Sequence, residues 1–190
     1  MLSTFLKVLL LTFSLTIPSQ ASELSYSDIE RSKTLLRLMP LVSDFIYLDN
    51  NQKLFRFSIL DVSHKERKFG NRGIVLAQLA ELGHKLNNRA TLLSIETQKS
   101  IKSVTPVPTV IFIQTPLSDT ELDDLMDWAR SNSILVFSPF EGDVERGVHA
   151  GLKIKQQTRL YLNIIELERS QIQIQADIYR ISDVYRGGAE

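Results

Sequence analysis

The order of apolar and polar positions predicts a chain in which strands and helices alternate. Apolar residues recur every three or four positions from Leu35 to Ile46, which predicts a first helix, kinked or restarted at Pro40. Four runs rich in strand-forming residues follow: KLFRFSIL (53–60), RATLLSIET (89–97), TVIFIQT (109–115) and SILVFS (133–138).

Two further helical patterns lie between these strands. Residues 74–82 carry apolar side chains at helical spacing and stop before Gly83. The segment 118–132 begins with Ser118 or Asp119 as the N-cap, and its predicted buried stripe is Leu122, Leu125, Met126 and Ala129. Because strands 109–115 and 133–138 are apolar on both faces, we expect a parallel sheet that is covered on both sides.

The pattern changes after Gly147. Residues 151–163 alternate apolar and polar positions around a polar turn at 155–158, which predicts a β-hairpin. Asn163 is the predicted N-cap of residues 164–170, with Glu166 completing a capping box. A last helix is predicted from about Gln175, with Ile178, Ile181 and Tyr185 aligned. The predicted fold class is therefore α/β: a mixed, mostly parallel sheet flanked by helices on both faces, with a C-terminal β-hairpin and helix.

The N-terminus has the pattern of a secretory signal peptide. Lys7 lies in a Leu-, Val- and Phe-rich run that ends near Ile17, and Ser19-Gln20-Ala21 places small residues before a cleavage point. We expect cleavage after Ala21, a single domain over residues 22–186 and a loose tail at 187–190. No later stretch has the roughly 20 apolar residues that a membrane helix needs.

Composition excludes several classes of function. The chain has no cysteine, so it has neither a disulfide nor a thiol nucleophile. Its 22 basic residues balance 22 acidic ones, which offers no general attraction for nucleic acid or anionic lipid. The three histidines (His64, His84 and His149) are scattered and match no metal-binding pattern. We therefore predict no cofactor and no metal.

Two loops are the candidates for binding. In FGNRGI, Gly70 and Gly73 stand just before a predicted helix, where backbone N–H groups with Arg72 could hold an anion. The alternative is a helix entry that only needs flexible residues.

The second loop, FEGDVERGVHAGLKI (140–154), follows a central strand. Gly147 is expected to turn the chain into the hairpin, and the exposed polar groups of a partner contact are predicted to be Glu141, Asp143, Arg146 and His149. A hydrolase that uses the acids of 141–145 is a further alternative.

Several strings, in this order, resemble the YfiR-like family of periplasmic proteins. They are ERSKTLLRLMPLVSDF (30–45), RFSILD (56–61), NNRATLLSIE (87–96), TVIFIQ (109–114) and the region from Ile134 to Tyr185. Gly147 falls on the family's turn glycine and Asn163 on its helix-opening Asn, whereas Val148 replaces a second glycine.

The resemblance implies a non-catalytic regulator in the periplasm. Proteins of this family bind the periplasmic sensor domain of an inner-membrane diguanylate cyclase and lower cyclic di-GMP synthesis, and an outer-membrane lipoprotein can sequester them. Residues 140–151 and the first helix (35–46) are the expected contact surface. The alternative function is a periplasmic protein that binds a small molecule or an anion.

Overall fold

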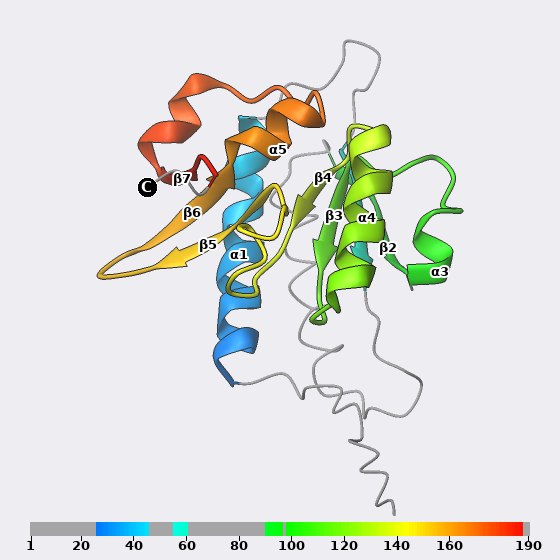
Figure 1. The fold of residues 1–190 in the computed structure, drawn as a ribbon, viewed down its shortest axis with the longest axis horizontal. Helices are drawn as coiled ribbons and strands as arrows, with labels where there is room; N and C mark the ends of the chain where they lie inside the picture. The colour runs from blue at the N-terminus through cyan, green and yellow to red at the C-terminus, as the bar shows by residue number, and fades with distance from the viewer. Residues whose placement is uncertain (1–25, 46–54, 61–89, 97, 188–190) are drawn as a thin grey trace, which may run out of the picture.

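The computed structural model describes residues 26–45, 55–60, 90–96 and 98–187, and these form one layered α/β unit (Figure 1). The strands are β1 (Phe55–Leu60), β2 (Ala90–Glu96), β3 (Val110–Ile113), β4 (Leu135–Phe137), β5 (Ala150–Ile154), β6 (Thr158–Asn163) and β7 (Ser182–Tyr185). The helices are α1 (Tyr26–Asp44), α3 (Gln98–Ile101), α4 (Asp119–Ser131), α5 (Ile164–Arg169) and the 3-10 helix η1 (Ala176–Arg180).

The strands form one sheet in the order β2-β1-β3-β4-β5-β6-β7. The five strands β2, β1, β3, β4 and β5 run parallel to one another, β6 is antiparallel to β5, and β7 is parallel to β6. The predicted mixed, mostly parallel sheet is confirmed. Strands β4 and β5 are joined by a single residue pair, Phe137 and Ala150, so the ladder is shortest in the middle of the sheet.

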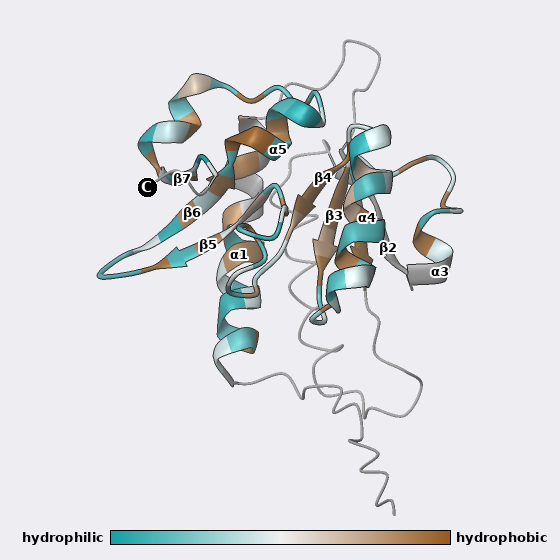
Figure 2. Ribbon diagram, in the orientation of Figure 1, coloured by the Kyte–Doolittle hydropathy of each residue, from teal (hydrophilic) through white to brown (hydrophobic). Residues whose placement is uncertain are grey.

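Each face of the sheet has its own apolar core, as the two-sided strands predict. In Figure 2 the ribbons of β3 and β4 are brown, the colour of hydrophobic residues. On one face α1, α5 and η1 cover Phe57, Ile59, Val110, Phe112, Leu135, Phe137, Leu152, Leu160 and Leu162. On the other face α3 and α4 cover Leu60, Ile111, Ile113 and Val136. The stripe predicted for α4 is buried as expected, and Trp128 packs at its edge.

Both predicted N-caps are confirmed, but only one of them forms a capping box. Ser118 forms a full capping box, since its hydroxyl accepts from the Glu121 N–H and its own N–H donates to the Glu121 carboxylate. Asn163 accepts from the Glu166 N–H at 3.1 Å. The carboxylate of Glu166 does not return this bond, because it is held by the side chains of Arg130 and Arg169 instead. The capping box predicted for Asn163 and Glu166 is therefore wrong.

The prediction of a C-terminal helix from about Gln175 is also wrong. Residues 176–180 form one short 3-10 helix, and residues 182–185 form strand β7. Ile178 is buried as a core residue, but Ile181 ends the turn and is 38% exposed. The edge of β6 provides a ladder for Val184 and Tyr185, which are strand-forming residues. Near the N-terminus, α1 continues through Pro40 without the expected restart.

Several predictions lie outside the described residues: the signal peptide at 1–21, the helix at 74–82, the end of the tail, and Gly70, Arg72 and Gly73. Among the described helices, none combines the length and the apolar character needed to cross a bilayer.

Candidate functional site

The loop from β4 to β5 turns sharply at two glycines. Gly142 has φ +86° and Gly147 has φ +112°, values in the left-handed region that glycine adopts without strain. Gly151, in β5, lies under the loop: a Cβ there would come within 2.8 Å of both the Ser138 carbonyl oxygen and a methyl group of Val144. The predicted turn at Gly147 is confirmed, and the loop packs against the strand that follows it.

Asp143 fixes this loop from the inside. Its carboxylate is 3% exposed and accepts from the Ser138 hydroxyl and from Nη1 of Arg146 at 2.8 Å. Nη2 of the same arginine donates to Asp119 at the start of α4. Burial raises the pKa of Asp143, while the bonds from Ser138 and the charge of Arg146 oppose the increase. Asp143 therefore holds the loop in its folded shape, and its partner Arg146 connects the loop to α4.

His149 is part of the core. The Val136 N–H donates to Nδ1 at 3.0 Å, so the ring proton lies on Nε2, which faces the Ser170 hydroxyl at 2.6 Å. Burial, aided by the positive charge of Arg130, lowers the pKa of His149 to about 3.

The expectation that all four polar loop residues are exposed is therefore wrong for two of them. Asp143 and His149 are buried because their polar atoms are bonded inside the fold, and only Glu141 and Arg146 are available to a partner at the surface.

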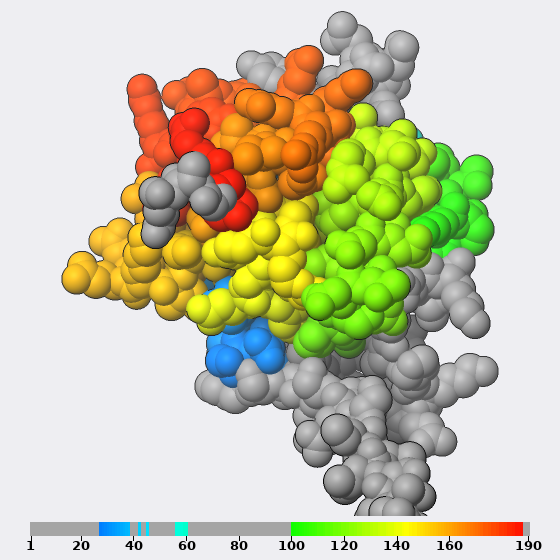
Figure 3. All heavy atoms as spheres, viewed as in Figure 1, coloured from blue at the N-terminus to red at the C-terminus, as the bar shows by residue number. Residues whose placement is uncertain are grey.

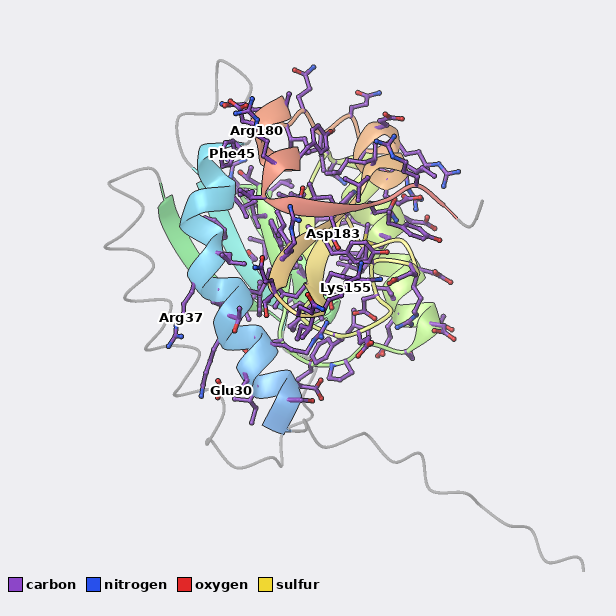
Figure 4. The ribbon with its side chains drawn as sticks, turned by 90° about the vertical axis from the view of Figure 1, so that its left-hand side faces the viewer. Glu30, Arg37, Phe45, Lys155, Arg180 and Asp183 are labelled. Carbon is purple, nitrogen blue, oxygen red and sulfur yellow. The ribbon has the colours of Figure 1, made fainter. Side chains whose placement is uncertain are left out.

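A cavity of about 550 Å³ lies beside this loop. It is bounded by the first turns of α1, by residues 140–145 and by the hairpin of β5 and β6. Figure 3 shows the start of α1 emerging next to the loop, and Figure 4 shows Glu30 near the beginning of α1 and Lys155 on the hairpin. Because β5 runs on past the end of β4, the cavity lies at the carboxyl edge of the parallel strands, where α/β proteins bind ligands.

Arg31 is the unusual residue in the cavity wall. It is only 8% exposed, and it donates from Nε to the Pro139 carbonyl and from Nη2 to the Leu152 carbonyl at 3.0 Å. Within the described part of the chain it has no carboxylate partner. A guanidinium has five N–H donors, so these two bonds leave three donors without an acceptor among the described residues.

The other charges around the cavity are mostly paired. Glu30 is paired with Lys33 at 2.6 Å, and Glu145 with Lys153 at 3.6 Å. Glu141 lines the cavity, is exposed, and has no ion-pair partner among the described residues.

Tyr161 forms part of the wall. Its ring lies under the ammonium of Lys153 at 4.4 Å, and burial, together with the nearby Glu145, raises its pKa to about 12. The phenol is therefore a neutral hydrogen-bonding group at physiological pH.

Sequence reasoning did not identify Arg31. The available signal was its position: Arg31 stands four residues before Leu35, on the apolar side of the first helix, where a charge is unexpected. The contact surface expected on this helix does not include Leu35, Leu36 and Val42, because these side chains are buried in the core. Of the three acids of residues 141–145 considered for hydrolysis, Glu141 and Glu145 line the cavity and Asp143 does not. No group of three potential metal ligands occurs in the described segments.

Comparison with protein-family models gives no match, and comparison with curated proteins gives none. Solved structures do match. A ligand-free, open substrate-binding protein with adhesive properties from Clostridium difficile aligns with TM-score 0.55 and 13% identity, covering 80% of this chain and 58% of that one. An ABC domain in complex with L-Trp from Streptococcus pneumonia gives TM-score 0.55 and 9% identity over 81% of this chain and 61% of the other.

A conserved domain protein from Vibrio cholerae gives TM-score 0.50 and 14% identity, over 82% and 60% of the two chains. This chain thus spans about three-fifths of the length of the structures it matches. At these identities the likeness establishes a shared α/β fold.

Proposed function

We propose that the protein binds a small molecule that carries a carboxylate, in the cavity between α1, the 140–145 loop and the hairpin. The observation that carries this proposal is Arg31, a cation that is more than nine-tenths buried, lines the cavity and lacks an acidic partner in the described chain.

The physical reason is the cost of burying an uncompensated charge. A cation removed from water needs a counter-ion or a full set of hydrogen bonds, and two carbonyl groups satisfy only part of a guanidinium. The remaining donors of Arg31 suit the two oxygens of a carboxylate, which an arginine holds in a bidentate arrangement. A bound acid would supply the missing negative charge inside the cavity.

The structural neighbours support ligand binding. One of them is a substrate-binding protein, and another was solved in complex with L-Trp. Because this chain corresponds to only part of those proteins, the proposal extends to ligand binding and not to transport.

The test compares matched acids and amides. The thermal stability of the protein is measured with hexanoate, hexanamide and larger carboxylate–amide pairs, and then repeated with Arg31→Gln. Arg37→Gln is the control, since Arg37 lies exposed on the same helix. We expect stabilisation by the acids only, lost in Arg31→Gln and kept in Arg37→Gln. Equal effects of acids and amides would refute the proposal.

The variant Arg72→Ala separates this cavity from the site predicted at Gly70, Arg72 and Gly73. If Arg72→Ala abolishes acid binding while Arg31→Gln retains it, the anion site is the glycine-rich one and not the cavity.

The resemblance to YfiR-like proteins supports a second proposal, in which the protein is exported to the periplasm and represses a membrane diguanylate cyclase without catalysis. Glu141 and Arg146 are exposed on the loop beside the cavity, where a partner domain could detect its occupancy. Deletion of the gene should raise cyclic di-GMP, and mature protein from the periplasmic fraction should begin at Ser22. Unchanged cyclic di-GMP and no membrane partner in a pull-down would exclude this role.

A further inference from the structure

We infer that the ligand carries a positively charged group as well as its carboxylate, and that Glu141 recognises it. This inference rests on the proposed function, because it assigns the second polar contact of the same cavity.

The charges of the cavity wall provide the first argument. Five ionic side chains line the cavity: Glu30, Arg31, Glu141, Glu145 and Lys153. Two of the carboxylates are already neutralised by lysines, at 2.6 Å and 3.6 Å. One cation, Arg31, and one anion, Glu141, have no such partner within the described residues. A ligand that complements both is a zwitterion with no net charge.

The position of Glu141 provides the second argument. Its neighbour Gly142 turns the chain at φ +86°, and the next residue, Asp143, is tied to Ser138 and Arg146. One residue further on, the carbonyl of Val144 accepts from the Asn163 side chain at 2.8 Å. The backbone that carries Glu141 is thus fixed before a ligand arrives, which limits the entropy lost on binding.

The remaining wall indicates the body of the ligand. The cavity is also lined by apolar and aromatic side chains, among them Phe140, Val144, Leu152 and Tyr161. Ile154, also in the wall, is 52% exposed and so offers apolar surface that a ligand can cover. These contacts suit a short apolar chain or ring between a carboxylate and an amine.

The experiment uses four compounds with the same six-carbon chain: hexanoate, 2-aminohexanoate, 6-aminohexanoate and hexylamine. Calorimetric titration of the full mature chain gives the affinity of each. We expect at least one aminohexanoate to bind about tenfold more tightly than hexanoate, as a partly desolvated ion pair allows, and hexylamine to bind most weakly.

The variant Glu141→Gln should remove this tenfold preference, which is measured as the ratio of the affinities for the aminohexanoate and for hexanoate. Glu168→Gln is the matched control, because Glu168 is an exposed acid of α5 and does not line the cavity. If hexanoate binds as tightly as both amino acids, or if Glu141→Gln keeps the preference, the inference is overturned while the proposed function stands. If none of the four compounds binds at millimolar concentration, both fail.

Discussion

The imidazole Nε2 of His149 lies 2.6 Å from the hydroxyl oxygen of Ser170, and both side chains are fully buried. This contact joins the start of β5 to the end of α5. Since Nδ1 accepts from the backbone of β4, one neutral histidine connects three elements. Protonation of Nδ1 would break this hydrogen bond.

The first prediction concerns acid pH. The pKa of His149 is lowered to about 3 in the folded protein, below its ordinary value of 6.5. Below pH 6.5 the unfolded chain takes up a proton that the folded protein does not, so folding stability falls as the pH drops. We expect a loss of roughly 1.4 kcal/mol per pH unit from this residue, ending near pH 3. Urea unfolding from pH 7 to pH 4 measures it.

The control for this prediction is His149→Gln, which keeps a hydrogen-bonding side chain and cannot titrate. The stability difference between the wild type and His149→Gln should shrink steadily below pH 6.5. Ser170→Ala, which retains the histidine, should keep the acid dependence. A stability difference that is constant from pH 7 to pH 4 would contradict the assignment of a neutral His149.

The second prediction concerns the close approach at Gly151. Gly151→Ala places a Cβ within 2.8 Å of the Ser138 carbonyl oxygen, which is backbone and cannot move aside easily. We expect a loss of about 1–3 kcal/mol in the free energy of unfolding. Gly142→Asn is the comparison, because Gly142 has open space and Asn tolerates positive φ. It should be the milder change in urea denaturation, and the reverse order would refute the packing argument.

The third prediction separates two roles of Asn163. Its Oδ1 caps α5, and its Nδ2 holds the Val144 carbonyl of the loop. Asn163→Ser keeps a capping oxygen but is too short for the loop, so it should cost about 1–2 kcal/mol. Asn163→Ala should cost about 1 kcal/mol more, because the cap is lost as well. Gln156→Ala, at an exposed position in the hairpin turn, should change stability by less than about 0.5 kcal/mol. Equal costs for the Ser and Ala variants would show that the cap adds nothing.

The fourth prediction concerns the ion pairs of Arg130. This side chain contacts Glu166, which is 7% exposed, at 3.2 Å, and Asp127, which is 76% exposed, at 2.7 Å. Double-mutant cycles should give a coupling of about 1–2 kcal/mol for the buried pair and below about 0.5 kcal/mol for the exposed one. Raising the salt concentration should weaken only the exposed pair noticeably. A stronger coupling to Asp127 would contradict this order.

Much of the fold could be predicted from the sequence, because strands β3 and β4 are apolar throughout and α4 has a regular buried stripe. The hairpin could be predicted from the alternation on either side of its turn. Strand β7 could not, since Ile178, Ile181 and Tyr185 fit a helical spacing equally well. Residues 182–185 form a strand and not a helix because they pair with the edge of β6. This pairing joins segments that are about 20 residues apart, so it leaves no local pattern in the sequence.

The candidate site was harder to predict for a related reason. The loop at 140–147 was recognised by its glycines, but the burial of Asp143 and His149 depends on Ser138, Val136 and Ser170. Arg31 contributes to the cavity only because α1 crosses the end of β5, more than 100 residues away in the chain. A sequence can show that an arginine interrupts an apolar stripe, whereas its missing counter-ion becomes visible only in the folded chain.

The single residue pair between β4 and β5 has a consequence for cooperativity. On either side of this pair the sheet has longer ladders, so the two parts of the sheet share few backbone hydrogen bonds. Arg31 spans this narrow junction, since it bonds to Pro139 after β4 and to Leu152 in β5. A ligand held by Arg31 and the loop would tie the two parts together. Ligand binding would then make the thermal unfolding transition sharper, in addition to raising the melting temperature.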